Sequence, residues 1–212
     1  WLLQGDPRST APWRDRLSFM LGRHWMAHGY GWVFPMAHDQ LKVGVCRLPP
    51  PHADKVPLGR SLQRLLHRCG LDQLPVLDRH GGRVASTIRR RQPLGAGALW
   101  AVGDAASTAN LLGGEGIRHA MDSASVLSEC LLTEGSHQDY QVALQRRFGW
   151  RWTVSNRLAR KTWWGLNTAD GDRRITRLIH GLSGQASAED LSSLLFAYRF
   201  ERYGWRLLPY LV

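Results

Sequence analysis

The residues most able to do chemistry gather in the stretch "LWAVGDAASTANLLGGEGIRHAM", residues 99–121. An apolar run ends at Gly103-Asp104, small residues follow, and a glycine-rich segment ending at Gly116 opens a run with helical spacing. An ionised carboxylate only accepts hydrogen bonds, so Asp104 suits a ligand that offers hydroxyl groups. The glycines allow a planar ligand to approach the backbone, while the first turn of the helix offers free N–H groups and the positive end of its dipole.

A ligand with hydroxyl groups on one side and a developing negative charge on the other fits this stretch. These are the features of the ribityl chain and the pyrimidine edge of a reduced flavin. The plainer alternative is that Asp104 caps the next turn and that the glycines form a tight connection, both of which are common. The order of strand, Gly-Asp, small residues and Gly-Glu-Gly at a helix start is more specific than either feature alone, and it favours flavin binding.

Two elements must hold these residues in place. Residues 98–102 are continuously apolar, which predicts a strand buried on both faces of a parallel sheet, with Asp104 at the carboxyl edge where α/β proteins bind ligands. The segment from Gly116 to about Leu132 predicts a helix. Its apolar positions at helical spacing are Ile117, Ala120, Met121, Ala124, Leu127 and Leu131.

The first half of the chain predicts a sheet with a covering helix. Residues 29–47 predict a β-hairpin whose first strand carries aromatic side chains on one face, at the period of a strand. Pro57 starts a predicted helix that continues to about Cys69 and ends at Gly70. A further short strand is predicted over residues 83–88.

The last third of the chain predicts helices. Ser136 with Asp139, and Ser187 with Asp190, have the spacing of capping boxes at helix starts. The segment 146–164 mixes arginine and tryptophan densely, which is typical either of a helix at a membrane surface or of ordinary helix packing through tryptophan.

Composition places broad bounds on the protein. The 212 residues suffice for one sizeable core or two small domains, and 43% hydrophobic with 21% charged residues is ordinary for a globular protein. No apolar run is long enough to cross a bilayer, so we expect a cytoplasmic protein, with peripheral membrane contact as an open alternative. Three widely spaced cysteines indicate a reducing compartment, and without paired Cys/His spacing we expect no metal site.

The net charge of +11 favours an anionic partner, although scattered arginines are more typical of a solvated surface. The cluster Arg89-Arg90-Arg91 fits either a solvated strand end or a contact to a diphosphate or to the phosphate of a nicotinamide cofactor. No pairing among the nine histidines indicates a proton relay, and we assign His119 no proton transfer.

The segment "AVGDAASTANLLGGEGIRHAMDSA" resembles the second flavin-binding motif of FAD-dependent oxidoreductases with the aromatic-hydroxylase type of fold. Within that group, "GYGWVFP" followed by "LKVGV" resembles the YxWxFP signature of the geranylgeranyl reductase family, and the order and spacing of the two motifs match. The resemblance covers roughly residues 29–130. It implies an α/β (α+β) fold, the carboxyl-terminal part of a two-domain FAD-dependent oxidoreductase, with an antiparallel substrate-domain sheet, one returning strand and helix of the FAD domain, and a helical C-terminal region.

The resemblance also implies roles for individual residues. Asp104 would bond the ribityl hydroxyls, with Gly103 allowing close approach. The backbone of three residues would face the flavin pyrimidine ring and stabilise the reduced anion: Gly114, Gly116 and Ile117. The pocket for an isoprenoid or prenyl-lipid substrate would be lined by Tyr30, Trp32, Phe34 and Pro35. An aromatic strand face can hold an apolar polyene without polar demands, but an ordinary core-facing strand is the alternative for any one of these aromatics.

The implied activity is the reduction of carbon–carbon double bonds of an isoprenoid chain by hydride transfer from reduced FAD, with NAD(P)H or another electron donor reducing the flavin. No catalytic residue or proton donor is identified. Two alternatives stay open: a flavin-dependent monooxygenase or carotenoid cyclase on the same fold, and a non-catalytic module that binds anionic lipid or nucleic acid. The aromatic motif favours the reductase, and nucleic acid is not the expected partner.

The sequence departs from the family pattern at Ser107, where glycine is usual, and at Leu111, where proline is usual, which indicates a divergent member. It also lacks the GxGxxG fingerprint that holds the pyrophosphate of FAD. We therefore expect the carboxyl-terminal portion of such an enzyme, unable to hold FAD tightly alone. The predicted regions are a substrate-binding sheet with its covering helix (1–92), the returning part of the FAD-binding domain (93–134) and a helical region (135–212).

Overall fold

The computed structural model describes residues 1–86 and 93–200. The chain divides into two compact units, which are described separately below. Unit 1 consists of Trp1–Gly82 and Lys161–Ile179, and unit 2 of Arg83–Arg160 and His180–Val212. In the described ranges, no helix has both the length and the apolar character needed to cross a membrane. The boundaries of the three predicted regions stay a prediction.

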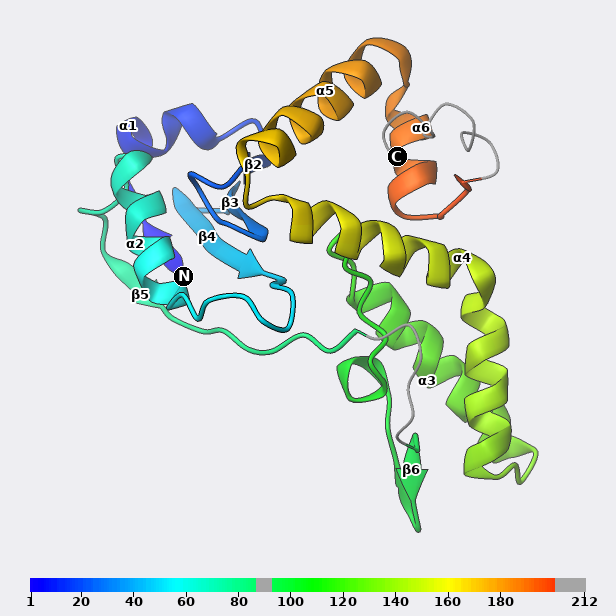
Figure 1. Cartoon of the computed structure of the whole chain (residues 1–212). Coiled ribbons are helices and arrows are strands. Elements are labelled where there is room, and N and C mark those ends of the chain that lie inside the picture. The colour runs from blue at the N-terminus through cyan, green and yellow to red at the C-terminus, as the bar shows by residue number, and fades with distance from the viewer. Residues whose placement is uncertain (87–92, 201–212) are drawn as a thin grey trace. The chain divides into compact units, whose positions relative to one another are not determined.

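An antiparallel sheet in the order β2-β3-β4-β1-β5 forms the centre of unit 1 (Figure 1). Its strands are β1 (Leu2–Gln4), β2 (Ser18–Leu21), β3 (Gly29–Pro35), β4 (Gln40–Arg47) and β5 (Val76–Asp78). The predicted hairpin is confirmed, because β3 and β4 pair from Gly29 opposite Arg47 to Pro35 opposite Leu41. The short helices α1 (Pro7–Thr10) and η1 (Ala11–Trp13) connect β1 to β2.

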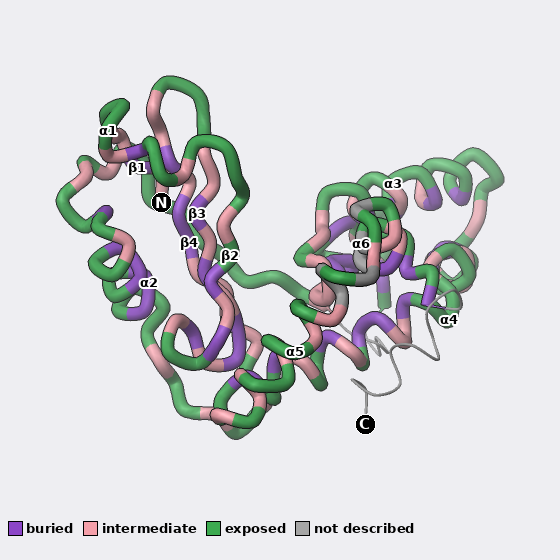
Figure 2. The backbone as a smooth tube through the Cα atoms, turned by 90° about the horizontal axis from the view of Figure 1, so that it is seen from above, coloured by how far each residue is buried: buried purple, intermediate pink, exposed green. Residues whose placement is uncertain are grey.

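Helix α2 (Leu58–Arg68) covers one face of this sheet, and its buried side faces β3 and β4 in Figure 2. Pro57 precedes its first turn and Gly70, at φ +68°, follows its last, so the predicted helix is confirmed. The core between helix and sheet includes Leu3, Val33, Leu41, Val43, Leu62, Leu65 and Leu66. Burying each such side chain contributes about 1.5–3 kcal/mol.

Strand β3 separates small from aromatic side chains. Gly31 and Val33 are buried on the side of α2, whereas the aromatic side chains between them are half-buried on the opposite face. A Cβ atom on Gly31 would lie 2.1 Å from Leu65 Cδ1, so the glycine allows α2 to approach the sheet closely. The aromatic side chains of β3 therefore lie on the face opposite the α2 core, where Tyr30 packs against the buried Trp163, and their role in substrate binding stays a prediction.

A second chain segment completes unit 1. It contains the end of α4 (His137–Gly165) and the start of α5 (Ala169–Gln185). The His28 N–H donates to the Leu166 carbonyl (2.9 Å), and the His28 Nδ1 lies 3.1 Å from the Trp164 carbonyl oxygen. The Arg23 N–H donates to the Asp172 Oδ1 (2.9 Å). These bonds fix the segment against the β2–β3 connection.

Unit 2 is mainly helical. Its elements are β6 (Gly95–Ala96), β7 (Leu99–Trp100), η2 (Gly103–Ala106), α3 (Ile117–Leu132), most of α4, the end of α5, and α6 (Ala188–Leu195). Both predicted capping boxes are confirmed, because Ser136 with Asp139 and Ser187 with Asp190 exchange hydrogen bonds. Helix α4 is interrupted at Gly149, whose φ of 62° and ψ of −165° are not helical.

The predicted buried strand over residues 98–102 is wrong. Only Leu99–Trp100 form a strand, which pairs antiparallel with β6, and the Leu99 side chain is 76% exposed. A strand of a parallel sheet has strand neighbours and layers packed on both of its faces, whereas the described part of unit 2 gives β7 only the pairing with β6. Asp104 consequently does not lie at the edge of a parallel sheet within the described residues.

The predicted helix over 116–132 is confirmed as α3, but its predicted apolar stripe is not the buried face. Ile117 is 82% exposed and Met121 is 67% exposed. The buried residues of α3 are His119, Ser123, Val126 and Cys130. The first two are polar, and each is hydrogen-bonded to a residue outside the helix, His119 to Tyr198 and Ser123 to Gly103. The predicted strand over 83–88 shows one bridge, between Ser86 and Thr108; its last two residues and the cluster Arg89-Arg90-Arg91 lie outside the described residues.

A glycine-to-alanine pair tests the packing of α2 on the sheet. Gly31→Ala should destabilise the protein by about 1–3 kcal/mol, because the new methyl group overpacks the buried Leu65. Gly59→Ala is the control, since nothing lies within 4 Å of a Cβ atom at that position in α2. Urea denaturation should show the control unchanged or more stable by up to about 1 kcal/mol. Equal stability of the two variants would contradict this packing.

Candidate cofactor site and aromatic face

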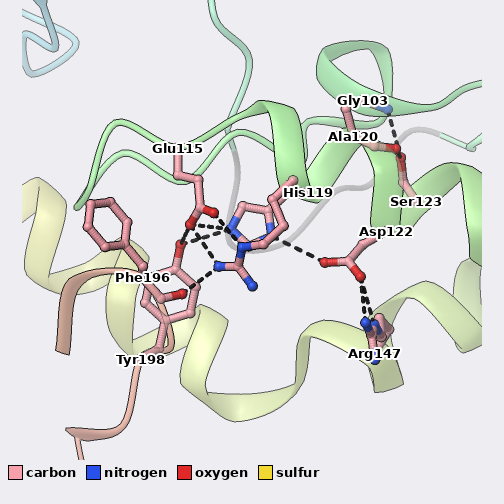
Figure 3. Close-up of polar contacts among 10 residues, drawn as sticks. Gly103, Glu115, His119, Ala120, Asp122, Ser123, Arg147, Phe196 and Tyr198 are labelled. Carbon is pink, nitrogen blue, oxygen red and sulfur yellow. Dashed lines mark hydrogen bonds and ion pairs between the residues drawn. The ribbon is translucent and has the colours of Figure 1, made fainter. Parts of the chain in front are cut away.

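Helix η2 fixes Gly103 and Asp104 against the first turns of α3. The Gly103 N–H donates to the Ser123 Oγ (2.9 Å), and the Ser123 hydroxyl donates to the Ala120 carbonyl (2.7 Å; Figure 3). Gly103 is buried at φ +57°, and a Cβ atom there would lie 3.1 Å from the Ala120 Cβ. The close approach that this glycine allows is thus to α3, while Asp104 is exposed beside it.

The end of η2 explains one departure from the family pattern. Ser107 has φ 59° and ψ 38°, the left-handed conformation, and its N–H donates to the Asp104 carbonyl (2.9 Å). Glycine adopts this conformation without strain, whereas an L-residue loses roughly 1–2 kcal/mol. Ser107 therefore keeps the turn at some cost in stability.

The four residues 111–114, here called the glycine loop, connect Asn110 to Glu115. The Asn110 N–H donates to the Glu115 carbonyl (2.7 Å), and the Glu115 N–H donates to the Asn110 carbonyl (3.0 Å). The buried Asn110 Oδ1 also accepts from the Leu112 N–H (3.0 Å) and from the Ser155 hydroxyl (2.9 Å). Side chain and backbone thus both hold the loop, and Leu111 needs no proline ring for that purpose.

The Glu115 carboxylate points back into unit 2, toward the C-terminal segment (Figure 3). Its Oε2 accepts from the Tyr198 hydroxyl (3.0 Å) and from the Arg118 Nη2 (2.7 Å), and its Oε1 accepts from the Arg118 Nε. Burial raises the pKa of Glu115, but the hydrogen bonds from Arg118 and Tyr198 outweigh burial, and the pKa lies below its ordinary value. Glu115 is therefore a charged structural anchor of the loop.

His119 lies beneath Glu115 in an aromatic enclosure formed by Phe148, Trp152 and Tyr198. It is 2% exposed, and its Nε2 lies 2.8 Å from the Tyr198 hydroxyl oxygen. Because that hydroxyl donates to Glu115, the Nε2–H is the donor in a continuous chain from His119 through Tyr198 to Glu115. Burial lowers the pKa of His119, so the neutral imidazole is favoured.

The start of α3 fits an anionic group. Gly116 is the N-cap of α3 and provides no side chain to cap the first-turn N–H groups, and among the described residues nothing lies within 4 Å of a Cβ atom at that position. The Gly114 backbone has φ +67°, and Gly114 and Ile117 are exposed at this helix start. Free amides, an open approach and the exposed Asp104 carboxylate fit the pyrimidine edge and ribityl hydroxyls of a flavin.

Unit 1 carries the second part of the predicted site. The aromatic face of β3 is a continuous row in which neighbouring ring centroids lie 5.1–6.2 Å apart, in the order Phe34, Trp32, Tyr30 and Trp163. Pro35 ends the strand beside this row. The Trp32 indole lies over Gly44 of β4, where a Cβ atom would be 2.1 Å from the ring. Burial raises the pKa of Tyr30 to about 12, so its hydroxyl stays neutral.

Two residues of this face were not predicted. Phe19 of β2 is 55% exposed and lies with its ring centroid 5.2 Å from that of Phe34. The alternation in "SFML" of β2 is the only sequence signal for it, and four residues are too few to recognise. Trp163 of α4 is 7% exposed, and its ring packs at a tilt against that of Tyr30. The two residues are 133 positions apart, so no local pattern reveals this contact.

The segment rich in arginine and tryptophan has mixed burial. Trp152 and Trp163 are each 7% exposed and pack inside units 2 and 1, whereas Trp150 is 59% exposed. Packing therefore accounts for two of these tryptophans, and membrane contact by the others stays a prediction. Among the described residues, no three potential metal ligands lie together.

Comparison with known proteins gives relatives named as reductases. A menaquinone reductase of Mycolicibacterium smegmatis is 29% identical over 176 residues, which are 73% of this chain and 39% of that protein. A menaquinone reductase of Mycobacterium tuberculosis is 28% identical over 141 residues, 62% of this chain and 33% of that protein. The chain thus spans between a third and two fifths of the length of these curated relatives. No protein-family model matches it.

A solved structure shows the fold. The crystal structure of a geranylgeranyl bacteriochlorophyll reductase-like protein from Thermoplasma acidophilum superimposes with a TM-score of 0.62 at 22% identity, over 95% of this chain and 51% of that one. The mixed α/β architecture with an antiparallel sheet is therefore similar to a geranylgeranyl reductase-like fold.

The buried His119 should make stability depend on pH. The folded protein disfavours the imidazolium, so the unfolded chain binds more protons, and stability should fall as pH drops below the ordinary histidine value of 6.5. Glu115 contributes only in a more acid range, because its pKa lies below 4.5. The facing groups are Glu115, Arg118, Asp122 and Tyr198.

Denaturation midpoints measured between pH 5 and 8 check this expectation. His119→Phe keeps an aromatic ring among Phe148 and Trp152 but removes the titrating group, and it should flatten the pH dependence. A wild-type slope that survives in this variant would show that other histidines cause it.

Proposed function

We propose that this chain is part of an FAD-dependent oxidoreductase that reduces carbon–carbon double bonds in the isoprenoid chain of a prenyl lipid. The observations that carry the proposal are the start of α3, which has no side-chain cap, and the exposed Asp104 on the η2 turn, whose Gly103 is hydrogen-bonded to the same helix. FAD, when bound, supplies hydride transfer to a double bond. The relatives named as menaquinone reductases and the fold of the reductase-like protein support an oxidoreductase.

The chain's own residues have separate tasks in this proposal. The Asp104 carboxylate accepts hydrogen bonds from ribityl hydroxyls, and the first-turn amides of α3 stabilise negative charge on the pyrimidine edge. Because the α3 start has no side-chain cap, a bound anionic group would be satisfied by the backbone itself.

The aromatic row supports an isoprenoid substrate. Rings at stacking distances form an apolar surface along β3, and the neutral Tyr30 hydroxyl adds no charge to it. Such a surface binds a polyene by dispersion and water exclusion, without demanding polar groups from the ligand. Menaquinone carries an isoprenoid side chain, and geranylgeranyl is an isoprenoid group. The compounds that appear in the names of the relatives and of the similar structure therefore both contain a prenyl chain.

Removal of the Asp104 carboxylate tests the cofactor site. In the full-length protein, Asp104→Ala should weaken flavin binding by about 10–100-fold, since hydrogen bonds to a charged group are worth about 1.5–3 kcal/mol. Asp15→Ala, which removes another exposed carboxylate in unit 1, is the control. Titration of apoprotein with FAD, followed by flavin fluorescence, measures both. Unchanged affinity in Asp104→Ala would remove the main support for the cofactor assignment.

An activity assay tests the substrate. With a chemical reductant and prenyl substrates, mass spectrometry should detect a gain of two hydrogens per reduced bond. Trp32→Ala should raise KM about tenfold with a smaller change in kcat, because a ring contact worth about 1–1.5 kcal/mol is lost. Trp150→Ala, an exposed tryptophan of unit 2, is the control. Oxygen consumption with hydroxylated product would instead favour the monooxygenase alternative.

A further inference from the structure

The residue that follows the glycine loop is held by side chains of α3 and of the C-terminal segment. This residue is Glu115, and its carboxylate is bonded to Arg118 within α3 and to Tyr198 from the C-terminal segment. The Arg118 Nη2 also donates to the Phe196 carbonyl. Two residues of the segment 196–200 therefore contact the charged groups at the start of α3 (Figure 3).

The surroundings of Tyr198 hold its side chain in one orientation. It is 6% exposed, and its ring stacks on His119 at a centroid distance of 5.7 Å and an interplanar angle of 21°. Its backbone has φ +52°, a left-handed conformation that a tyrosine adopts only when its surroundings impose it. The hydroxyl accepts from His119 and donates to Glu115, so both of its hydrogen-bonding capacities are used.

The geometry connects this hydroxyl to the loop backbone. The Glu115 side chain is anchored by Tyr198 and Arg118, while the Glu115 backbone forms both loop-closing hydrogen bonds with Asn110. A glycine-rich loop has more conformational freedom than other segments, so its shape depends on such anchors. Loss of one anchor loosens the Asn110–Glu115 pair and the amides that follow it.

We propose that Tyr198 is a positioning residue, whose hydroxyl holds Glu115, and through Glu115 the glycine loop, in the shape that presents the first-turn amides of α3 to the flavin. The second half of this inference rests on the proposed function. The first half concerns the loop itself and is testable without cofactor.

Hydrogen exchange tests the loop. Tyr198→Phe removes one oxygen and keeps the ring, and it should speed exchange of the Asn110 and Glu115 amides about tenfold in the full-length apoprotein. Glu115→Gln, which keeps the size of the side chain but removes the charge that both Arg118 and Tyr198 bond, should speed exchange at least as much. The double variant should exchange no faster than Glu115→Gln alone, because Tyr198 acts on the loop through Glu115. Unchanged exchange in Tyr198→Phe overturns the proposal.

The redox potential of bound flavin tests the connection to the cofactor. Loosened amides stabilise the reduced anion less, so a tenfold loss of preference for reduced over oxidised flavin in Tyr198→Phe corresponds to a midpoint potential about 30 mV lower. Ser187→Ala is the matched control, because it removes the cap of α6 without touching Glu115. It should lower thermal stability and leave the potential unchanged.

The outcomes separate the two proposals. A potential that moves in Tyr198→Phe and not in Ser187→Ala supports a positioning role, whereas equal shifts, or none, in both variants overturn it. If the wild-type full-length protein takes up no flavin, the proposed function fails, and the exchange experiment still decides whether Tyr198 holds the loop.

Discussion

Two antiparallel main-chain hydrogen bonds between Asn110 and Glu115 set the shape of the glycine loop, and the rest of the candidate site in unit 2 depends on them. Four loop residues, two of them glycines, have a large conformational entropy to lose, so the ends of the loop must be fixed by other groups. Asn110 is fixed by Ser155 of α4, and Glu115 by Arg118 and Tyr198. A half-buried carboxylate needs such partners, and the C-terminal segment supplies one of them through Tyr198.

Charges around His119 are balanced in pairs. Glu115 is neutralised by Arg118, and Asp122 by Arg147, whose Nε lies 3.2 Å from the Asp122 Oδ1. The imidazole between them is favoured as the neutral form, in keeping with its aromatic enclosure. Among the described residues, the charged groups beneath the first turn of α3 are therefore paired, and the dipole of that helix acts on whatever approaches its open end.

The sequence predicts elements whose signals are local and misses contacts that span the chain. The hairpin of β3 and β4, helix α2 and both capping boxes follow from alternation, Pro57, Gly70 and Ser-x-x-Asp spacing. The buried face of α3 is missed because His119 owes its burial to Tyr198, 79 residues away, rather than to hydrophobicity. The strand over 98–102 is overpredicted because an apolar run indicates burial without saying which partner provides it.

Of the candidate site, too, only the parts with local sequence signals could be located from the sequence. The aromatic alternation in β3 locates one face of the sheet, and the glycine spacing locates the start of α3. Asn110 and Tyr198 escape sequence reasoning, since a buried asparagine in a loop and a tyrosine beyond α6 have no distinguishing pattern around them. Ser107 becomes understandable only once its left-handed backbone is known.

The two faces of β3 differ in what a mutation there would disturb. Gly31 and Val33 support the hydrophobic core under α2, while the rings on the other side contact one another and Trp163. Exchange of one large side chain for another on the outer face leaves the core intact. Side chains on the outer face of such a strand can therefore change over evolutionary time while the domain continues to fold, because the residues that fill the core alternate with those that do not.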